Sequence, residues 1–179
     1  MEKLRIQALN NIIIRTTLNG ALQRGKVYKK GLPDNKKAVF RKSLAKELGI
    51  VMQKVQQKQT YNDAAHFKTI ERFATHISKN YGDVLHQRKL RIGTAQKMIN
   101  LYWKMSWLLH QQHMPPIHCP FDSVVIKQLD TSVQHIRWTT SNSMEDYKLL
   151  VKAAKKVAGN NVSIAEWELE NYGLKVNYK

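Results

Sequence analysis

Residues 94–112 read TAQKMINLYWKMSWLLHQQ, and this stretch decides the fold class of the chain. Apolar side chains lie on most sides of a helix drawn through it, where a surface helix would carry one apolar stripe. These side chains are Met98, Leu101, Tyr102, Trp103, Met105, Trp107, Leu108 and Leu109. A helix that is apolar all round is usually buried at the centre of a domain. The stretch therefore predicts a central helix, which Pro115 and Pro116 bring to an end.

Helical periodicity continues on both sides of this stretch. It predicts a first helix over residues 2–18, with Leu4, Ala8, Ile12 and Ile13 on one face. A basic loop over Asn19–Pro33 should follow, because it contains Gly20, Gly25, Gly31 and Pro33. Five apolar residues at spacings of three and four predict the next helix over about 36–58. They are Phe40, Leu44, Leu48, Val51 and Val55.

Capping residues mark the remaining helices. Asn62 or Asp63 should begin a third helix, with Gly82 after its end. A shorter helix is expected over about 120–129. Ser143 and Asp146 have the spacing of a capping box and predict a helix that Gly159 ends, while Ser163 and Glu166 fit the box proper and open a last short helix. Strand patterns are nearly absent, so we expect an all-α fold with about seven helices in a single domain over residues 1–179.

The charge of the chain is strongly positive and unevenly distributed. Lys and Arg total 30 against 13 Asp and Glu, for a formal net charge of +17. Residues 1–60 hold 14 basic and 3 acidic side chains, whereas residues 114–179 hold 8 and 7. Such an excess opposes compaction through self-repulsion, so folding alone does not require it. A polyanionic partner does, because each phosphate contact releases counterions.

Nucleic acid is therefore the expected partner, with DNA preferred over RNA. Tyr28, among lysines, is placed to stack on a base or sugar while the cations meet phosphates. The residues expected to bind are Arg24, Lys26, Tyr28, Lys29, Lys30, Lys36, Lys37, Arg41, Lys42 and Lys46. A solvated charged face would have the same composition. An acidic protein or a nucleoprotein complex, as in phage or defence biology, is the alternative partner.

Other functional classes find little support in the sequence. The apolar runs are short, such as Val124-Val125-Ile126, so no membrane partner is expected. The start MEKLRIQ lacks the apolar core of a signal peptide, and Cys119 is the only cysteine, which together favour a cytoplasmic protein. His110, His113, His118 and Cys119 are metal-ligand types, but His118 and Cys119 are adjacent and hard to aim at one ion. We expect no metal and no cofactor.

One region carries a family resemblance. Residues 90–97 read LRIGTAQK at the start of the predicted central helix, and residues 120–125 read PFDSVV. This pairing resembles the core of the helix-hairpin-helix DNA glycosylases, in which a glycine-bearing hairpin feeds a helix and a Pro-hydrophobic-Asp segment begins another. The resemblance covers about residues 88–130. It departs from the family pattern at Arg91, which stands where the hairpin normally has its first glycine.

The resemblance implies a base-excision enzyme that acts in DNA repair. Asp122 would occupy the place of the catalytic aspartate, and Lys97 would be the nearest candidate nucleophile. Gly93 would let the backbone approach a phosphate, Thr94 would cap the helix that points at it, and Arg91 would bind nucleic acid together with them. The structural alternative is simpler. Gly93 and Thr94 would belong to a capped buried helix, and Asp122 would be an N-cap, for which Asp is among the favoured residues.

Overall fold

The computed structural model describes residues 1–109 and 114–173, and this part of the chain is all-α, as predicted. The α-helices are α1 Glu2–Leu22, α2 Asp34–Gln56, α3 Asp63–Tyr81, α4 Ile92–Leu108, α5 Ser123–Ile126, α6 Met144–Ala158 and α7 Ile164–Glu168. Shorter helical turns are η1 His86–Arg88, η2 Thr131–Val133 and η3 Leu169–Gly173. No strand occurs in these described residues, and none of their helices is long and apolar enough to cross a membrane.

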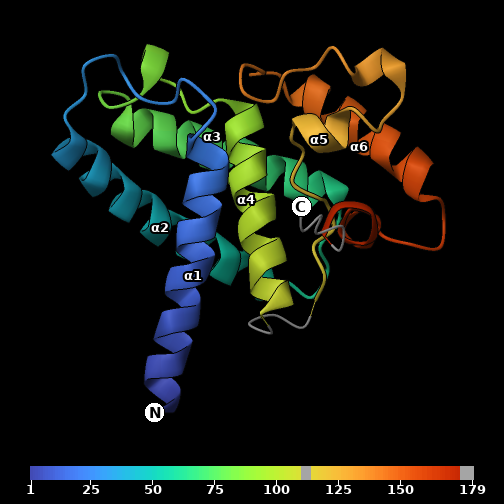
Figure 1. Ribbon diagram of the computed structural model, residues 1–179, viewed down its shortest axis with the longest axis horizontal. Helices are drawn as coiled ribbons and strands as arrows, with labels where there is room; N and C mark the ends of the chain where they lie inside the picture. The colour runs from blue at the N-terminus through green and yellow to red at the C-terminus, as the bar shows by residue number, and fades with distance from the viewer. Residues whose placement is uncertain (110–113, 174–179) are drawn as a thin grey trace, which may run out of the picture.

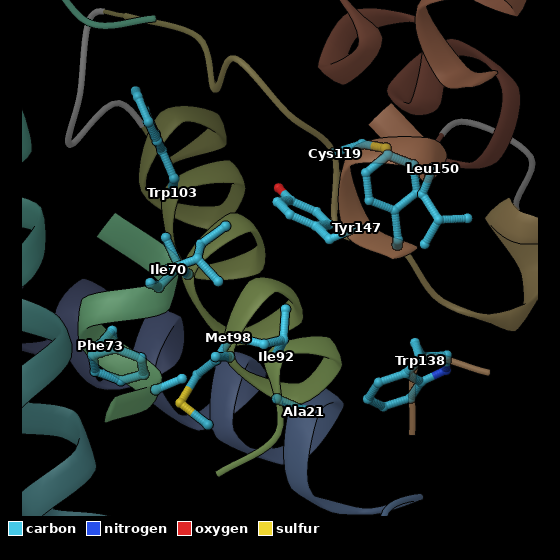
Figure 2. Close-up of a cluster of buried hydrophobic side chains, with 14 of the residues drawn as sticks. Ala21, Ile70, Phe73, Ile92, Met98, Trp103, Cys119, Trp138, Tyr147 and Leu150 are labelled. Atoms are coloured by element: carbon cyan, nitrogen blue, oxygen red, sulfur yellow. The ribbon is translucent and has the colours of Figure 1, made fainter. Parts of the chain in front are cut away.

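The predicted central helix is α4. Every residue from Ile92 to Asn100 is buried, and α4 packs against α1, α2, α3 and α6. Figure 1 shows α1 and α4 running side by side through the middle of the molecule. Figure 2 shows Met98 and Ile92 of α4 between Phe73 of α3 and Trp138. The first half of α4 thus has neighbours on every side, whereas in the second half Tyr102 and Trp107 are half-buried and Leu108 is exposed, so the expected all-round burial is only partly confirmed. Its predicted end, residues 110–112, lies outside the described residues.

Helix α1 differs from its prediction in length and in its buried face. It runs to Leu22, so the expected loop over Asn19–Pro33 begins four residues later. The extra turn forms because Ala21 and Leu22 are buried, and because Gly20 approaches α4 so closely that a Cβ would lie 2.7 Å from Leu101. Of the predicted apolar face, Ile13 is buried, but Leu4 and Ile12 are 65% and 51% exposed. The N-terminal half projects from the body (Figure 1).

Helices α2 and α3 follow their predictions closely. Phe40, Leu44, Leu48 and Val55 are buried, as their spacing indicates, and Val51 is half-buried. Asn62 is the N-cap of α3, since its side chain accepts a hydrogen bond from the amide of Ala65. Residue Gly82 follows α3 as expected, in an ordinary right-handed conformation.

The last third of the chain packs over α3 and α4 through shorter elements. Helix α5 spans only Ser123–Ile126, so the longer helix expected over 120–129 is wrong; tight turns follow it. The capping box of Ser163 and Glu166 is confirmed. Residue Gly159 ends α6 with φ of 77°, as glycine at a helix end allows. Glu168 of α7 forms a buried ion pair of 2.5 Å with Lys104, which ties α7 to α4.

Candidate functional site

Three segments that are distant in sequence meet at the start of α4. The Arg91 guanidinium donates hydrogen bonds to the carbonyls of Lys26, at 3.3 Å, and Thr139, at 3.2 Å. It thereby joins the loop after α1 to the turn before α6. The structure thus brings the predicted basic loop and the predicted hairpin region into one place, although 65 residues separate Lys26 from Arg91.

Gly93 and Thr94 lie on the buried side of this junction. The Gly93 amide donates to the carbonyl of Ser141 at 3.1 Å, and a Cβ on Gly93 would lie 1.9 Å from the carbonyl oxygen of Trp138. Glycine is therefore needed here for the approach of another protein segment. Thr94 is buried, and its hydroxyl has no hydrogen-bond partner in the described part of the chain. The N-cap position belongs to Arg91, contrary to the expectation for Thr94.

Lys97 and Asp122, the two residues paired by the resemblance, are in contact. Lys97 Nζ lies 3.0 Å from Asp122 Oδ2 and 4.4 Å from the centre of the Trp138 ring. The side chains are 10% and 30% exposed. The other oxygen of Asp122 accepts hydrogen bonds from the amides of Val124 and Val125, so Asp122 is the N-cap of α5. Both carboxylate oxygens thus have partners within the chain.

The charge state of Asp122 follows from these partners. Burial alone would raise the pKa of Asp122, but the Lys97 ammonium and the two backbone amides outweigh it and lower the pKa. Asp122 is therefore ionised at neutral pH. The Lys97 ammonium gains a counter-charge on one side and an aromatic face on the other, and both contacts stabilise a cation.

A buried amide holds the segment that carries Asp122 against α4. The Gln96 amide group donates to the carbonyls of Gly93 and Phe121, and its oxygen accepts from the Phe121 amide. One turn further, the Asn100 amide group donates to the carbonyl of Cys119 at 3.0 Å. These two polar residues, which lie four apart on one side of the buried helix, were not predicted as functional. Their spacing was the available signal.

Asn100 also belongs to a polar chain that runs from the interior to the half-exposed Asp63 and that we call the His66–Asp63 chain. It consists of His66, Asn100, Tyr147, His118 and Asp63. The Asn100 oxygen lies 2.7 Å from His66 Nε2, and its amide group donates to the Tyr147 hydroxyl at 3.0 Å. That hydroxyl lies 2.7 Å from His118 Nδ1, while His118 Nε2 lies 3.3 Å from Asp63. Figure 2 shows Tyr147 reaching from α6 toward the α4 side.

The protonation states give this chain one direction. Burial lowers the pKa of His66 to about 3 and also lowers the pKa of His118, so both rings are neutral at pH 7. Burial raises the pKa of Tyr147 well above its ordinary value, so its hydroxyl keeps its proton. The hydrogen bond from His118, together with Lys155, holds the pKa of Asp63 low. Each link therefore donates toward Asp63, starting from the Nε2 proton of His66.

A hollow of about 360 Å³ opens beside the Lys97–Asp122 pair. We call it the Arg24 pocket. Arg24, Lys127 and Arg137 line it, and all three are exposed. Ile126, Ile136 and Trp138 contribute apolar surface, and Ser123 and Thr139 contribute hydroxyl groups. Arg24 was expected to bind nucleic acid. Lys127 and Arg137 were not, because they belong to the nearly neutral last third of the chain.

The remaining predicted cations lie along the loop and α2. In Figure 1 the first half of α2 lies to the left of α1 and α4, whereas α5 lies to their right. These side chains are exposed and have no carboxylate partner in the described residues: Lys26, Lys29, Lys30, Lys36, Lys42 and Lys46. The basic surface, as we use the term, consists of these six residues and Arg24.

Three predicted binding residues have partners inside the protein. Lys37 pairs with Asp34 at 2.8 Å. Arg41 donates to the side chain of Asn19 on α1 at 2.6 Å, so it joins two helices. Tyr28 is half-buried and packs edge-on against Phe40, with ring centres 6.1 Å apart. These three are therefore less available to a ligand than their neighbours.

No group of three metal-ligand side chains occurs in residues 1–109 and 114–173, while His110 and His113 lie outside the described residues. No protein-family model matches the chain, and neither a curated protein nor a solved structure is significantly similar to it.

Proposed function

We propose that this protein binds nucleic acid, DNA in preference to RNA, by contacting backbone phosphates. The observation that carries the proposal is that the basic surface is exposed and lacks carboxylate partners in the described part of the chain. The net charge of +17 means that the carboxylates of the chain are too few to balance its cations, and such an excess attracts a polyanion. Affinity that comes from phosphates depends little on base sequence.

Fluorescence anisotropy tests this proposal with a labelled DNA duplex of about 20 base pairs and the matching RNA duplex, at low salt. The test variant reverses Lys29 and Lys30 to Glu. The matched control reverses Lys68 and Lys152, which are exposed on α3 and α6 and change the net charge equally. At about 0.15 M salt, where the Debye length is about 8 Å, we expect the test variant to lose about tenfold or more in affinity and the control much less, because charges outside the interface are then screened.

Equal losses of affinity in the two variants would mean that only the total charge matters. The basic surface would then not be the binding site. No binding to either duplex at low salt would overturn the proposal. Retention of an acidic protein under the same conditions would then support the alternative partner class.

Base excision is a second candidate, favoured by one observation: Lys97 and Asp122 lie 3.0 Å apart. In the ion pair Lys97 is an ammonium, so a lyase reaction needs the pair to separate and Lys97 to lose its proton before attack; Asp122 would then stabilise a developing cation. Borohydride reduction in the presence of duplexes with damaged bases tests this, since it traps a lysine–DNA adduct. A trapped adduct that Lys97→Met abolishes would support the candidate, and release of no base from any duplex would exclude it.

A further inference from the structure

The Arg24 pocket differs from the basic surface because several cations line one hollow. Arg24 follows α1, Lys127 follows α5, and Arg137 lies in the turn before α6. Three separate segments thus place a cation on one hollow, whereas the lysines of the loop and α2 are spread along their elements. Several cations around one hollow suit a compact anion with several charged oxygens.

Among the residues that the structure describes, no carboxylate lines the Arg24 pocket. The nearest acidic residue in sequence is Asp122, next to Ser123, and Lys97 already neutralises it. A comparison within the molecule shows the contrast. The groove between α2 and α3, of about 340 Å³, is also lined by cations, including Lys54 and Arg72, but Glu47 lines it as well and pairs with His76 at 3.2 Å. The Arg24 pocket is therefore the better anion site of the two.

The apolar part of the lining limits what the anion is attached to. Ile126, Ile136 and Trp138 are buried residues whose accessible edges form this part of the pocket. These edges are narrow, because Ile126, Ile136 and Trp138 are 3%, 5% and 3% exposed. They can contact the part of a ligand next to its anionic group, as the sugar of a nucleotide stands next to its phosphate.

We propose that the Arg24 pocket binds the phosphomonoester of a nucleotide, with its sugar at the accessible edges of Ile126, Ile136 and Trp138. A phosphomonoester carries close to two negative charges at pH 7, whereas a diester within a strand carries one. It also enters a hollow end-on, while an internal diester has chain on both sides. The ligand is either the phosphorylated end of a strand, which rests on the proposed function, or a free mononucleotide.

The experiment compares DNA duplexes that differ only in their ends. The affinity of the full chain is measured for duplexes with 5′-phosphate, 3′-phosphate or hydroxyl ends. The test variant carries Arg24→Gln and Arg137→Gln. The control variant carries Lys54→Gln and Arg72→Gln, which remove the same charge from the groove between α2 and α3. All four side chains are exposed, so circular dichroism should show unchanged folds.

For the wild type and the control we expect one kind of phosphorylated end to bind about tenfold more tightly than hydroxyl ends. For the test variant we expect this ratio to fall to about one. Equal affinity of the wild type for all ends would overturn the inference and leave the proposed function intact. Loss of the preference in both variants would also overturn it.

If no duplex binds at all, the proposed function fails, and calorimetric titration with adenosine monophosphate decides the pocket separately. Binding of the mononucleotide that the test variant loses and the control keeps would support the pocket with a free ligand. No heat of binding in the wild type would overturn the inference together with the proposed function.

Discussion

Gly93 is the residue whose replacement the structure tolerates least. A Cβ at this position would lie 1.9 Å from the Trp138 carbonyl oxygen and 2.8 Å from its carbon, and backbone cannot rotate away as a side chain can. We expect Gly93→Ala to cost about 3 kcal/mol or more of unfolding free energy, measured by urea denaturation. Gly49 is the matched control. It lies within α2 with open space at its Cβ, so Gly49→Ala should stabilise by about 0.5–1 kcal/mol. Equal effects at the two positions would contradict the close contact.

Asp122→Asn separates the two structural roles of Asp122. Asn caps a helix about as well as Asp, so the hydrogen bonds to Val124 and Val125 survive. The Lys97 ammonium, 10% exposed, loses its counter-charge. Removing one partner of a fully buried pair costs about 3–5 kcal/mol, and the exposure of Asp122 reduces this to roughly 1–3 kcal/mol. Urea denaturation of Asp122→Asn, Lys97→Met and the double variant measures the coupling. If the stability loss of the double variant equals the sum of the two single losses, the pair does not interact.

His66 should make the stability of the protein sensitive to acid. Burial lowers its folded pKa to about 3, below the value near 6.5 of an unfolded histidine. Between these values the unfolded chain binds the extra proton, so the unfolding free energy falls as the pH falls. The slope from one such group is about 1.4 kcal/mol per pH unit. Urea denaturation between pH 7 and pH 4 measures it, and His66→Gln should reduce the slope by about one proton. An unchanged slope would mean that His66 charges without unfolding.

At the scale of the helix, α1 offers a comparison of two adjacent isoleucines. Ile13 is 1% exposed and Ile12 is 51% exposed, although they are the same residue type and adjacent in sequence. We expect Ile13→Ala to cost about 2–4 kcal/mol of unfolding free energy, while Ile12→Ala changes it by less than about 0.5 kcal/mol. Thermal or urea unfolding decides this. Similar losses would mean that a partner covers the projecting half of α1 in solution.

The same helix shows where sequence patterns stop being informative. In α2, spacings of three and four identified the buried face because one stripe of the helix meets the core. In α1 the buried residues begin at Ile13, so within the described part of the chain the apolar side chains of the first turns, such as Leu4, lie outside the core. The predicted lengths of α1 and α5 were wrong for the same reason. Contacts with distant segments decide where α1 ends, after Ala21, and how short α5 is. The periodicity of a helix therefore indicates which of its faces is apolar, but not which other segment covers that face.

The candidate site was predictable in part. The sequence indicated Arg24 through the uneven charge and Arg91 through the family resemblance. It also indicated two alternative roles for Asp122, as a helix N-cap and as a catalytic aspartate. It did not indicate Arg137 or Lys127, since neither belongs to a basic cluster in the chain. Nor did it indicate that His66, Asn100 and Tyr147 connect, because they come from α3, α4 and α6. Residues recruited from distant segments require a tertiary structure to be recognised as one site.

At the scale of the whole molecule, the uneven charge predicts steep salt dependence of binding. If about six phosphates are neutralised by the basic surface, the logarithm of affinity should fall against the logarithm of salt with a slope of about −5 on duplex DNA. Anisotropy titrations at several salt concentrations measure the slope. A slope shallower than about −1 would show that ion release contributes little, and base or shape contacts would have to replace it.

The single direction of the His66–Asp63 chain has a consequence for isotope exchange. His66, Asn100, Tyr147 and His118 are all buried, so water reaches the chain only near its ends. The hydroxyl proton of Tyr147 leaves either through His118 toward Asp63 or when α6 moves off α3 and α4. The exchange rate of this proton is therefore the sum of the two routes, and it sets an upper limit on how often α6 separates from α3 and α4.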